Sequence, residues 1–241
     1  MTKQSSLKQP VKGLIFDYGA TIDSNGTHWA EVIWQGYEAA GLPVSKDNFR
    51  LAYVYGERTL ATEPLIKPEH NFRDLLNIKI NLQIDYLRRE ALLTGEIPDH
   101  AALQITAFCY GFALGSIEKA RPVLQQLASR YPFVLVSNFY GNIASVLEDF
   151  NLLSFFPDII ESAVVGIRKP DPRIFALGVE KLALPPQEIV VIGDSYGKDI
   201  VPAASLGCQT IWIKGKGWDE KENEIDHPHI LSDFSDLRNL L

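Results

Sequence analysis

Three carboxylates follow apolar runs of the sequence. Asp17 comes directly after VKGLIF, and Asp194 and Asp199 lie in GDSYGKD, which follows IVVIG. Carboxylate oxygens are preferred ligands of hard divalent cations such as Mg²⁺. If the two runs are strands of one sheet, the sequence predicts a site for such a cation at the ends of these strands.

Other polar residues are placed to bind the charge of an anionic substrate. Ser137 and Asn138 close FVLVSN, and Lys169 lies in GIRKPDP. A hydroxyl and an ammonium group can bind and neutralise an anionic substrate. Each residue alone could cap a turn or lie on the surface, but their order along the chain favours one common site.

The pattern around these positions predicts a parallel sheet. The apolar runs are nearly continuous, which is typical of strands that are buried on both faces, and helical spacing in 120–131 and 171–184 places helices between strands. We therefore expect a doubly wound α/β sheet, a Rossmann-like core that binds its ligand at the carboxyl ends of the strands. The predicted strands are 11–16, 133–137, 158–162, 189–193 and 210–214.

The first two predicted strands are too far apart for a simple crossover. Between them the apolar residues have helical spacing, as in HWAEVIWQGYEAAG, without a convincing strand pattern. We expect a core formed by 1–26 and 116–241, with a mostly helical domain, 27–115, inserted into it. The helix predicted in 120–131 has Pro122 near its start, where proline is tolerated.

Composition and charge narrow the class of protein. The 241 residues are 46% hydrophobic, enough for a sizeable core, and carry a net charge of -7 with a pI near 5.3. This acidic balance disfavours a nucleic-acid partner. Two cysteines and the lack of signal-like or membrane-spanning stretches favour a reducing compartment. We predict a cytoplasmic monomer or homodimer that binds a small anionic molecule, and neither nucleic acid nor membrane.

The sequence resembles the haloacid dehalogenase superfamily in four motifs, which occur in the same order: FDYGAT, VSN, RKPDP and GDSYGKD. The resemblance covers essentially the whole core, and the inserted helices resemble the cap that closes over the site in one branch. It implies that Asp17 is the nucleophile, which forms an aspartyl intermediate that water hydrolyses. Ser137 and Lys169 would be the other catalytic residues, binding and neutralising the transferring group.

The resemblance also implies a Mg²⁺ site. Asp17, the backbone carbonyl of Gly19 and Asp194 would hold the ion, with Asp199 in support. The cap should set substrate choice, because it closes the site. Its most polar stretch contains Arg58, a candidate for binding a second anionic group of the substrate. The predicted substrate-binding residues are Thr21, His28, Arg58 and Asn138.

Gly19 departs from the family pattern. Phosphatases of this superfamily carry a second aspartate at this position, as acid for the leaving oxygen and base for water. A positioned acid or base contributes ~10² to 10⁴ in rate. Ordinary phosphomonoesters should therefore turn over slowly unless another group, such as Asp23 or His28, takes the proton.

Four interpretations follow from this departure. The first is a Mg²⁺-dependent hydrolase of a small phosphorylated metabolite, acting through Asp17. The second is a phosphonatase-like enzyme, which needs a cap lysine that Lys46, Lys67 and Lys79 do not convincingly match. The third is a dehalogenase-like enzyme, a branch that works without the metal that GDSYGKD would bind. The fourth is a non-catalytic protein that binds Mg²⁺ and a phosphorylated ligand.

Overall fold

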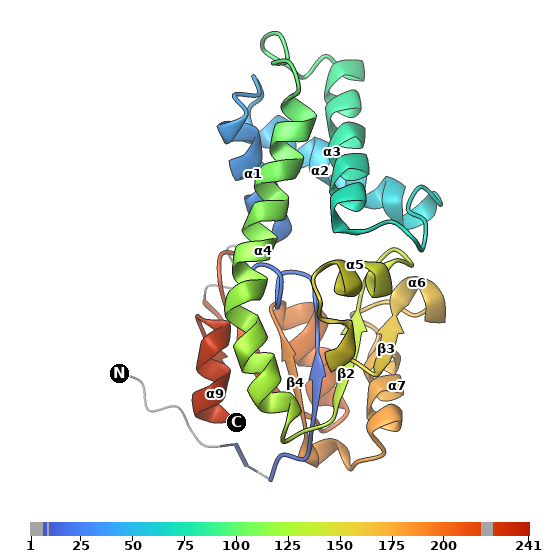
Figure 1. Cartoon of the computed structure of the whole chain (residues 1–241), viewed down its shortest axis with the longest axis vertical. Helices are drawn as coiled ribbons and strands as arrows, with labels where there is room; N and C mark the ends of the chain where they lie inside the picture. Colours follow the sequence, from blue (N-terminus) through green and yellow to red (C-terminus); the bar gives the residue numbers. More distant parts are fainter. Residues whose placement is uncertain (1–6, 9, 218–223) are drawn as a thin grey trace.

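One parallel sheet forms the centre of the core. The computed structural model describes residues 7–8, 10–217 and 224–241. In these residues six strands pair in the order β3-β2-β1-β4-β5-β6, and every neighbouring pair is parallel (Figure 1). The predicted doubly wound α/β sheet is confirmed. The strands are β1 (Gly13–Phe16), β2 (Phe133–Ser137), β3 (Asp158–Glu161), β4 (Ile189–Gly193), β5 (Gln209–Ile213) and β6 (Ile230–Leu231).

Helices cover both faces of the sheet, which explains the continuous apolar runs. In β1, Leu14 and Phe16 pack into one apolar cluster with residues of α4, α5 and α9, while Ile15 packs into a second cluster with residues of α7 and α8. Successive strand residues point to opposite faces, so both sets must be apolar. The helices of the core are α5 (Ile143–Asp149), α6 (Ser162–Val165), α7 (Arg173–Leu182), α8 (Val201–Ser205) and α9 (Leu237–Leu240), with α4 described below.

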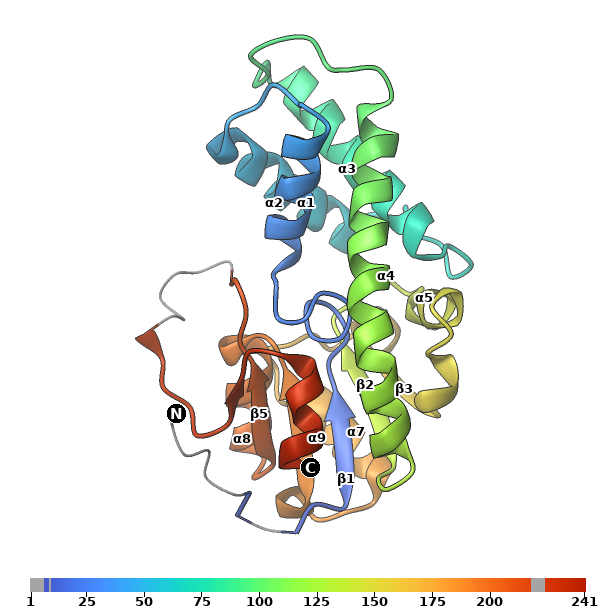
Figure 2. The same cartoon turned by 60° about the vertical axis from the view of Figure 1, so that its left-hand side comes forward.

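The insertion between β1 and β2 is helical, as predicted. Residues 27–115, all of which the structure describes, contain no strand and form the upper lobe in Figures 1 and 2. Side-chain caps begin three of the helices: His28 accepts from the Ala30 N–H, Ser45 accepts from the Asn48 N–H, and Asn71 forms a capping box with Asp74. The lobe is made of α1 (Trp29–Ala39), α2 (Lys46–Thr62), α3 (Phe72–Arg89) and the first part of α4 (Ala101–Ala128).

Helix α4 differs from the sequence-based expectation. It runs without interruption from the cap down along the sheet (Figure 2), so Pro122 lies inside a 28-residue helix and not near a helix start. Proline removes one backbone hydrogen bond, but the flanking turns are held by buried residues such as Ala120 and Val123. The predicted domain boundary between 115 and 116 falls within this helix, and the division into core and cap stays a prediction.

Strand β6 was missed because two residues are too few to show a period. It extends the sheet through pairing of Trp212 with Ile230 and of Ile213 with Leu231. The described part of the chain has no helix that is both long and apolar enough to cross a bilayer.

Candidate active site

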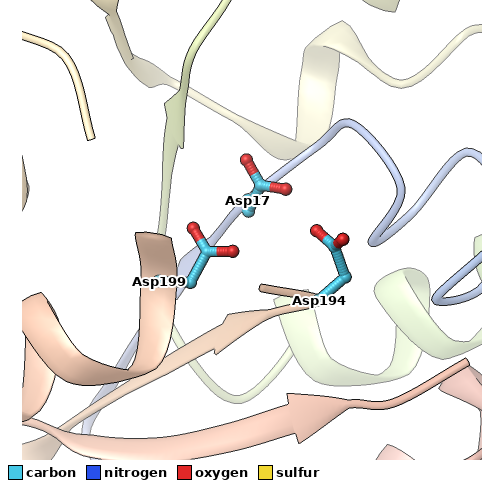
Figure 3. Close-up of side chains that lie close together, drawn as sticks. All are labelled: Asp17, Asp194 and Asp199. Atoms are coloured by element: carbon cyan, nitrogen blue, oxygen red, sulfur yellow. The ribbon is translucent and has the colours of Figure 1, made fainter. Parts of the chain in front are cut away.

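Three aspartates meet at the carboxyl edge of the sheet. β1 and β4 pair in parallel with Phe16 opposite Ile192, so Asp17 and Asp194 leave the sheet side by side. The turn after β4 brings Asp199 to the same place, because its Oδ2 accepts from the Ser195 N–H at 3.1 Å. One carboxylate oxygen from each aspartate lies within 4.8 Å of the others, around one common space (Figure 3).

Lys169 joins two of these carboxylates. Its Nζ lies 2.6 Å from Asp17 Oδ1 and 2.7 Å from Asp199 Oδ1, and all three side chains are buried. Burial lowers the pKa of Lys169, but Asp17 and Asp199 raise it more, so the net pKa lies above its usual value. The lysine therefore remains an ammonium group beside Asp17.

Asn138 and Thr21 position this cluster. The Asn138 amide accepts from the Lys169 N–H at 2.9 Å and donates to the Lys169 carbonyl at 3.2 Å, which fixes the backbone of the lysine. The Thr21 hydroxyl lies 2.9 Å from Asp17 Oδ2 and 3.1 Å from Asp194 Oδ1 and can donate to either. Both residues act on the orientation of the charged groups.

The cluster has an excess of negative charge that a cation would relieve. Burial raises the pKa of Asp194 well above its usual range, and the charges of Asp199 and Asp17 raise it further. Burial also raises the pKa of Asp199, although Lys169 opposes the shift. Three carboxylates face one ammonium group, and their oxygens are the ligands that hard divalent cations prefer. The donor set therefore fits such a metal.

The cluster lies in a cavity between the sheet and the cap. The cavity has a volume of about 360 Å³ and includes Asp17, Gly19, Ser137 and Lys169 in its lining. Trp29, Tyr53, Phe72 and Leu76 are among the residues that close it from the cap side. A carboxylate, a hydroxyl and an ammonium group thus face one partly open space of the size of a small ligand.

These features agree with a comparison against protein families, in which a model for haloacid dehalogenase-like hydrolases matches residues 11–207. The chain is a haloacid dehalogenase-like hydrolase. The resemblance seen in the four sequence motifs is thereby confirmed, and the helical insertion is consistent with the cap of this family.

Several curated proteins are similar to parts of this hydrolase. Haloacid dehalogenase-like hydrolase domain-containing protein 3 of Danio rerio is 32% identical over 43% of this chain and 43% of its own length. Glyceraldehyde 3-phosphate phosphatase of Methanocaldococcus jannaschii is 41% identical over 32% of this chain and 35% of its own length. The 5-amino-6-(5-phospho-D-ribitylamino)uracil phosphatase YigB of Escherichia coli is 31% identical over 52% of each chain. The matches span about half of these relatives or less.

Solved structures share the fold over nearly the whole chain. The hydrolase YfnB from Bacillus subtilis, bound to magnesium, has a TM-score of 0.56 at 19% identity and covers 97% of this chain and 99% of its own. A dehalogenase with an intermediate complex has a TM-score of 0.63 at 16% identity, and the match covers 98% of this chain and 99% of the dehalogenase. At these identities the similarity establishes the architecture of core and cap.

The structure brings most of the predicted site residues of the hydrolase together. Thr21 is the first exception: it is fully buried behind Asp17 and Asp194 and does not line the cavity. Arg58 is the second, since it lies exposed on α2 outside the lining, while its neighbour Glu57 faces the cavity. The predicted residues that line the cavity are Asp17, Gly19, His28, Ser137, Asn138, Lys169, Asp194 and Asp199.

A polar trio in the cavity was not predicted. Lys79 of α3 lies 2.7 Å from Glu57 of α2, and the Tyr140 hydroxyl lies 3.0 Å from Lys79 Nζ and 2.8 Å from Glu57 Oε2. Burial lowers the pKa of Lys79, but Glu57 and then Tyr140 raise it above the usual value. Lys79 lies on the apolar face of α3 between Leu76 and Ile80. A lysine among the apolar residues of a helix face is the feature of the sequence that could have revealed this trio.

Lys79 also bears on the phosphonatase-like interpretation. A lysine must lose its proton before it can form a Schiff base, and the ion pair with Glu57 opposes that loss. Lys79 is the cap lysine that lines the cavity among the described residues. The structure therefore gives no support to a Schiff-base mechanism.

Asp23 and His28 lie where the core enters the cap. Asp23 Oδ1 accepts from the Ala20 N–H at 2.7 Å and Oδ2 from Trp29 Nε1 at 2.9 Å. Burial raises the pKa of Asp23 to about 8, against the opposing effect of these hydrogen bonds. Burial, and then the charge of Lys198, lower the pKa of His28 to about 4, and its Nδ1 accepts from the Ala30 N–H as the cap of α1.

Proposed function

We propose that this hydrolase is a Mg²⁺-dependent phosphatase of a small phosphorylated metabolite, with Asp17 as the nucleophile. The observation that carries the proposal is the placement of Asp17: it lies in the cavity, 2.6 Å from the Lys169 ammonium and beside Asp194 and Asp199. Two of the partial relatives are phosphatases of small phosphorylated molecules, which supports the same class of substrate.

Mg²⁺ suits the donor set of this site. Asp17, Asp194 and the Gly19 carbonyl would hold the ion, with Asp199 in support. When bound, the metal offsets the repulsion between the carboxylates and an anionic substrate and withdraws charge from the phosphoryl oxygens.

The residues of the chain divide the remaining work. Ser137 and Lys169 hydrogen-bond the phosphoryl oxygens and stabilise the negative charge of the transition state. An Asp17 oxygen attacks phosphorus, so that a bond from Asp17 to phosphorus forms and the bond to the leaving oxygen breaks. Water then attacks phosphorus, which releases inorganic phosphate and regenerates the Asp17 carboxylate. Thr21 and Asn138 hold Asp17 and Lys169 in position for both steps.

The cavity restricts the substrate to a small molecule. Its volume of about 360 Å³ leaves room for a phosphoryl group and a leaving group of modest size. Arg168 and Lys198 lie exposed along its lining, where they favour the approach of an anion. Deeper in the cap, Glu57 neutralises Lys79, so we propose a leaving group that is polar but carries little net charge.

A dehalogenase and a non-catalytic binding protein are the competing functions. Halide leaves without a proton, so the glycine at position 19 would not slow a dehalogenase. The excess of carboxylates in the cluster favours the phosphatase, because a metal-free site would leave their repulsion uncompensated.

A substrate screen separates these functions. The native protein is assayed with Mg²⁺ against aryl phosphates, small alkyl phosphates and haloacids, with Asp17→Asn as the matched control. We expect release of inorganic phosphate that requires Mg²⁺ and Asp17. Halide release would establish a dehalogenase, and binding without turnover would establish a binding protein.

A further inference from the structure

Gly19 leaves an open space at the position where a proton must be exchanged. A phosphate ester with a poor leaving group needs an acid for the leaving oxygen, and the later step needs a base for water. A Cβ built on Gly19 meets no atom within 4 Å, and Gly19 is not among the glycines of positive φ. The position therefore faces the cavity with nothing to donate a proton.

The carboxyl group of Asp23 lies next to this space. Its Oδ1 is 2.7 Å from the nitrogen of Ala20, the residue that follows Gly19. Since that nitrogen is two bonds from the Gly19 Cα, the carboxylate oxygen lies within about 5 Å of it. A tight turn produces this approach: Ala20 has a φ of 66°, and the Ile22 N–H donates to the Tyr18 carbonyl at 2.9 Å.

The other carboxylates of the cavity already have partners. Among the described residues, five carboxylates line it: Asp17, Asp23, Glu57, Asp194 and Asp199. Three of them form the cation cluster, and Glu57 is paired with Lys79. Asp23 is the remaining carboxylate, and within the described residues its two oxygens accept hydrogen bonds from the Ala20 N–H and from Trp29 Nε1.

Asp23 is also suited to gain and lose a proton. It is 1% exposed, and burial raises its pKa to about 8, near the pH at which an acid and base catalyst is most efficient. Its charged and titratable neighbours are Asp17, which raises the pKa of Asp23 further, and Tyr18, whose own pKa burial raises. His28 is less suitable, because its Nδ1 caps α1.

We propose that Asp23 replaces the aspartate that is missing at position 19, an inference that rests on the proposed phosphatase function. The protonated carboxyl group gives its proton to the leaving oxygen, directly or through one water molecule in the space beside Gly19. The products of this step are the alcohol, the phosphorylated Asp17 and the Asp23 carboxylate. The carboxylate then takes a proton from the attacking water, which restores both aspartates and releases inorganic phosphate.

The test compares Asp23→Asn with the native protein on an alkyl and an aryl phosphate. We expect a loss of ~10² or more in kcat/KM for the alkyl ester, because kcat/KM reports the step in which the leaving oxygen needs a proton. For the aryl ester, which leaves without a proton, kcat/KM should change by less than about threefold. Equal losses in kcat/KM for both esters, or a kcat/KM of Asp23→Asn equal to the native value for both, would overturn the proposal. If the native protein turns over neither ester, or if Asp17→Asn keeps the native activity, the proposed function itself fails.

Two further variants separate catalysis from folding. Asp85→Asn makes the same chemical change at an exposed carboxylate of α3 outside the cavity, so we expect the ratio of alkyl to aryl turnover to stay near the native value. Gly19→Asp fits the open position and should restore alkyl turnover when combined with Asp23→Asn. If Asp23→Asn does not fold, the single variant Gly19→Asp still tests the proposal. A ratio of alkyl to aryl turnover within about threefold of the native ratio supports the role of Asp23, because the proton is already supplied. A tenfold rise in this ratio overturns the proposal.

Discussion

At the scale of single residues, the site depends on one buried cation among several carboxylates. Lys169 contacts Asp17 and Asp199, and its backbone is fixed by Asn138. The sequence predicted these residues because each follows a strand or precedes one at the same sheet edge. The contacts of Thr21 and the turn that places Asp23 beside Gly19 could not be predicted, because they depend on side-chain orientation in a loop.

Lys169→Met should abolish most activity and destabilise the fold. We expect kcat to fall by ~10² or more, because in the proposed function Lys169 stabilises the negative charge of the transition state. The free energy of unfolding without metal should fall by about 3 kcal/mol, because two buried carboxylates lose their partner. Lys181→Met is the matched control: Lys181 forms an exposed pair with Asp158, and its loss should change stability by less than about 0.5 kcal/mol. Similar stability of the two variants would refute this account of the cluster.

The raised pKa of Asp23 predicts that the free energy of unfolding depends on pH, which can be measured without an activity assay. Its pKa is raised to about 8 in the native state, against about 3.9 in the unfolded chain. Between these values the native state binds more protons, so stability falls as pH rises. Relative to Asp23→Asn, the native protein in EDTA should lose more than about 1 kcal/mol of unfolding free energy between pH 5 and 8. Urea titrations at several pH values measure this, and parallel curves would show that Asp23 does not hold a proton.

At the scale of elements, the strands were predictable and the helix boundaries were less so. Continuous apolar runs located β1 to β5, while β6 was too short and Pro122 suggested a helix start inside α4. Packing on both lobes overrides the cost of that proline. The trio of Glu57, Lys79 and Tyr140 joins α2, α3 and the loop after β2, a contact between elements that periodicity cannot reveal.

The trio should behave as a coupled unit. Lys79→Met leaves Glu57 without its cation, and we expect a loss of about 2 kcal/mol, reduced from the fully buried case because Glu57 is 33% exposed. Adding Glu57→Gln removes the unpaired charge, so the double variant should be more stable than Lys79→Met alone. A double-mutant cycle by thermal or urea unfolding gives the coupling energy. Additive effects of the two substitutions would show that the pair contributes nothing.

At the scale of the whole molecule, core and cap meet around one cavity. The sequence predicted both parts, because the insertion between the first two strands is too long for a crossover loop and its apolar residues have helical spacing. Which cap residues face the site was not predictable: Arg58 was expected there, but Glu57 lies in the cavity and Arg58 lies outside. Neighbouring residues on a helix point about 100° apart, so a shift of one residue decides which side chain meets the substrate.

Cation binding should stabilise the whole molecule. Mg²⁺ at a hundredfold excess over its Kd should raise the free energy of unfolding by about 2.7 kcal/mol. Asp194→Asn should remove most of this gain, because it takes one carboxylate from the cluster. Asp158→Asn, at an exposed position outside the cluster, is the control and should keep the gain. Equal stabilisation of both variants, by thermal unfolding and calorimetric titration, would place the cation elsewhere.

The central claim is that phosphoryl transfer passes through Asp17. The most direct test is to mix the native protein with Mg²⁺ and an aryl phosphate, quench in acid within one turnover, and locate any added phosphate by peptide mass spectrometry. We predict a phosphate adduct on Asp17 that forms with the first burst of product and is absent from Asp17→Asn. Turnover without an adduct, or an adduct on another residue, would contradict the account.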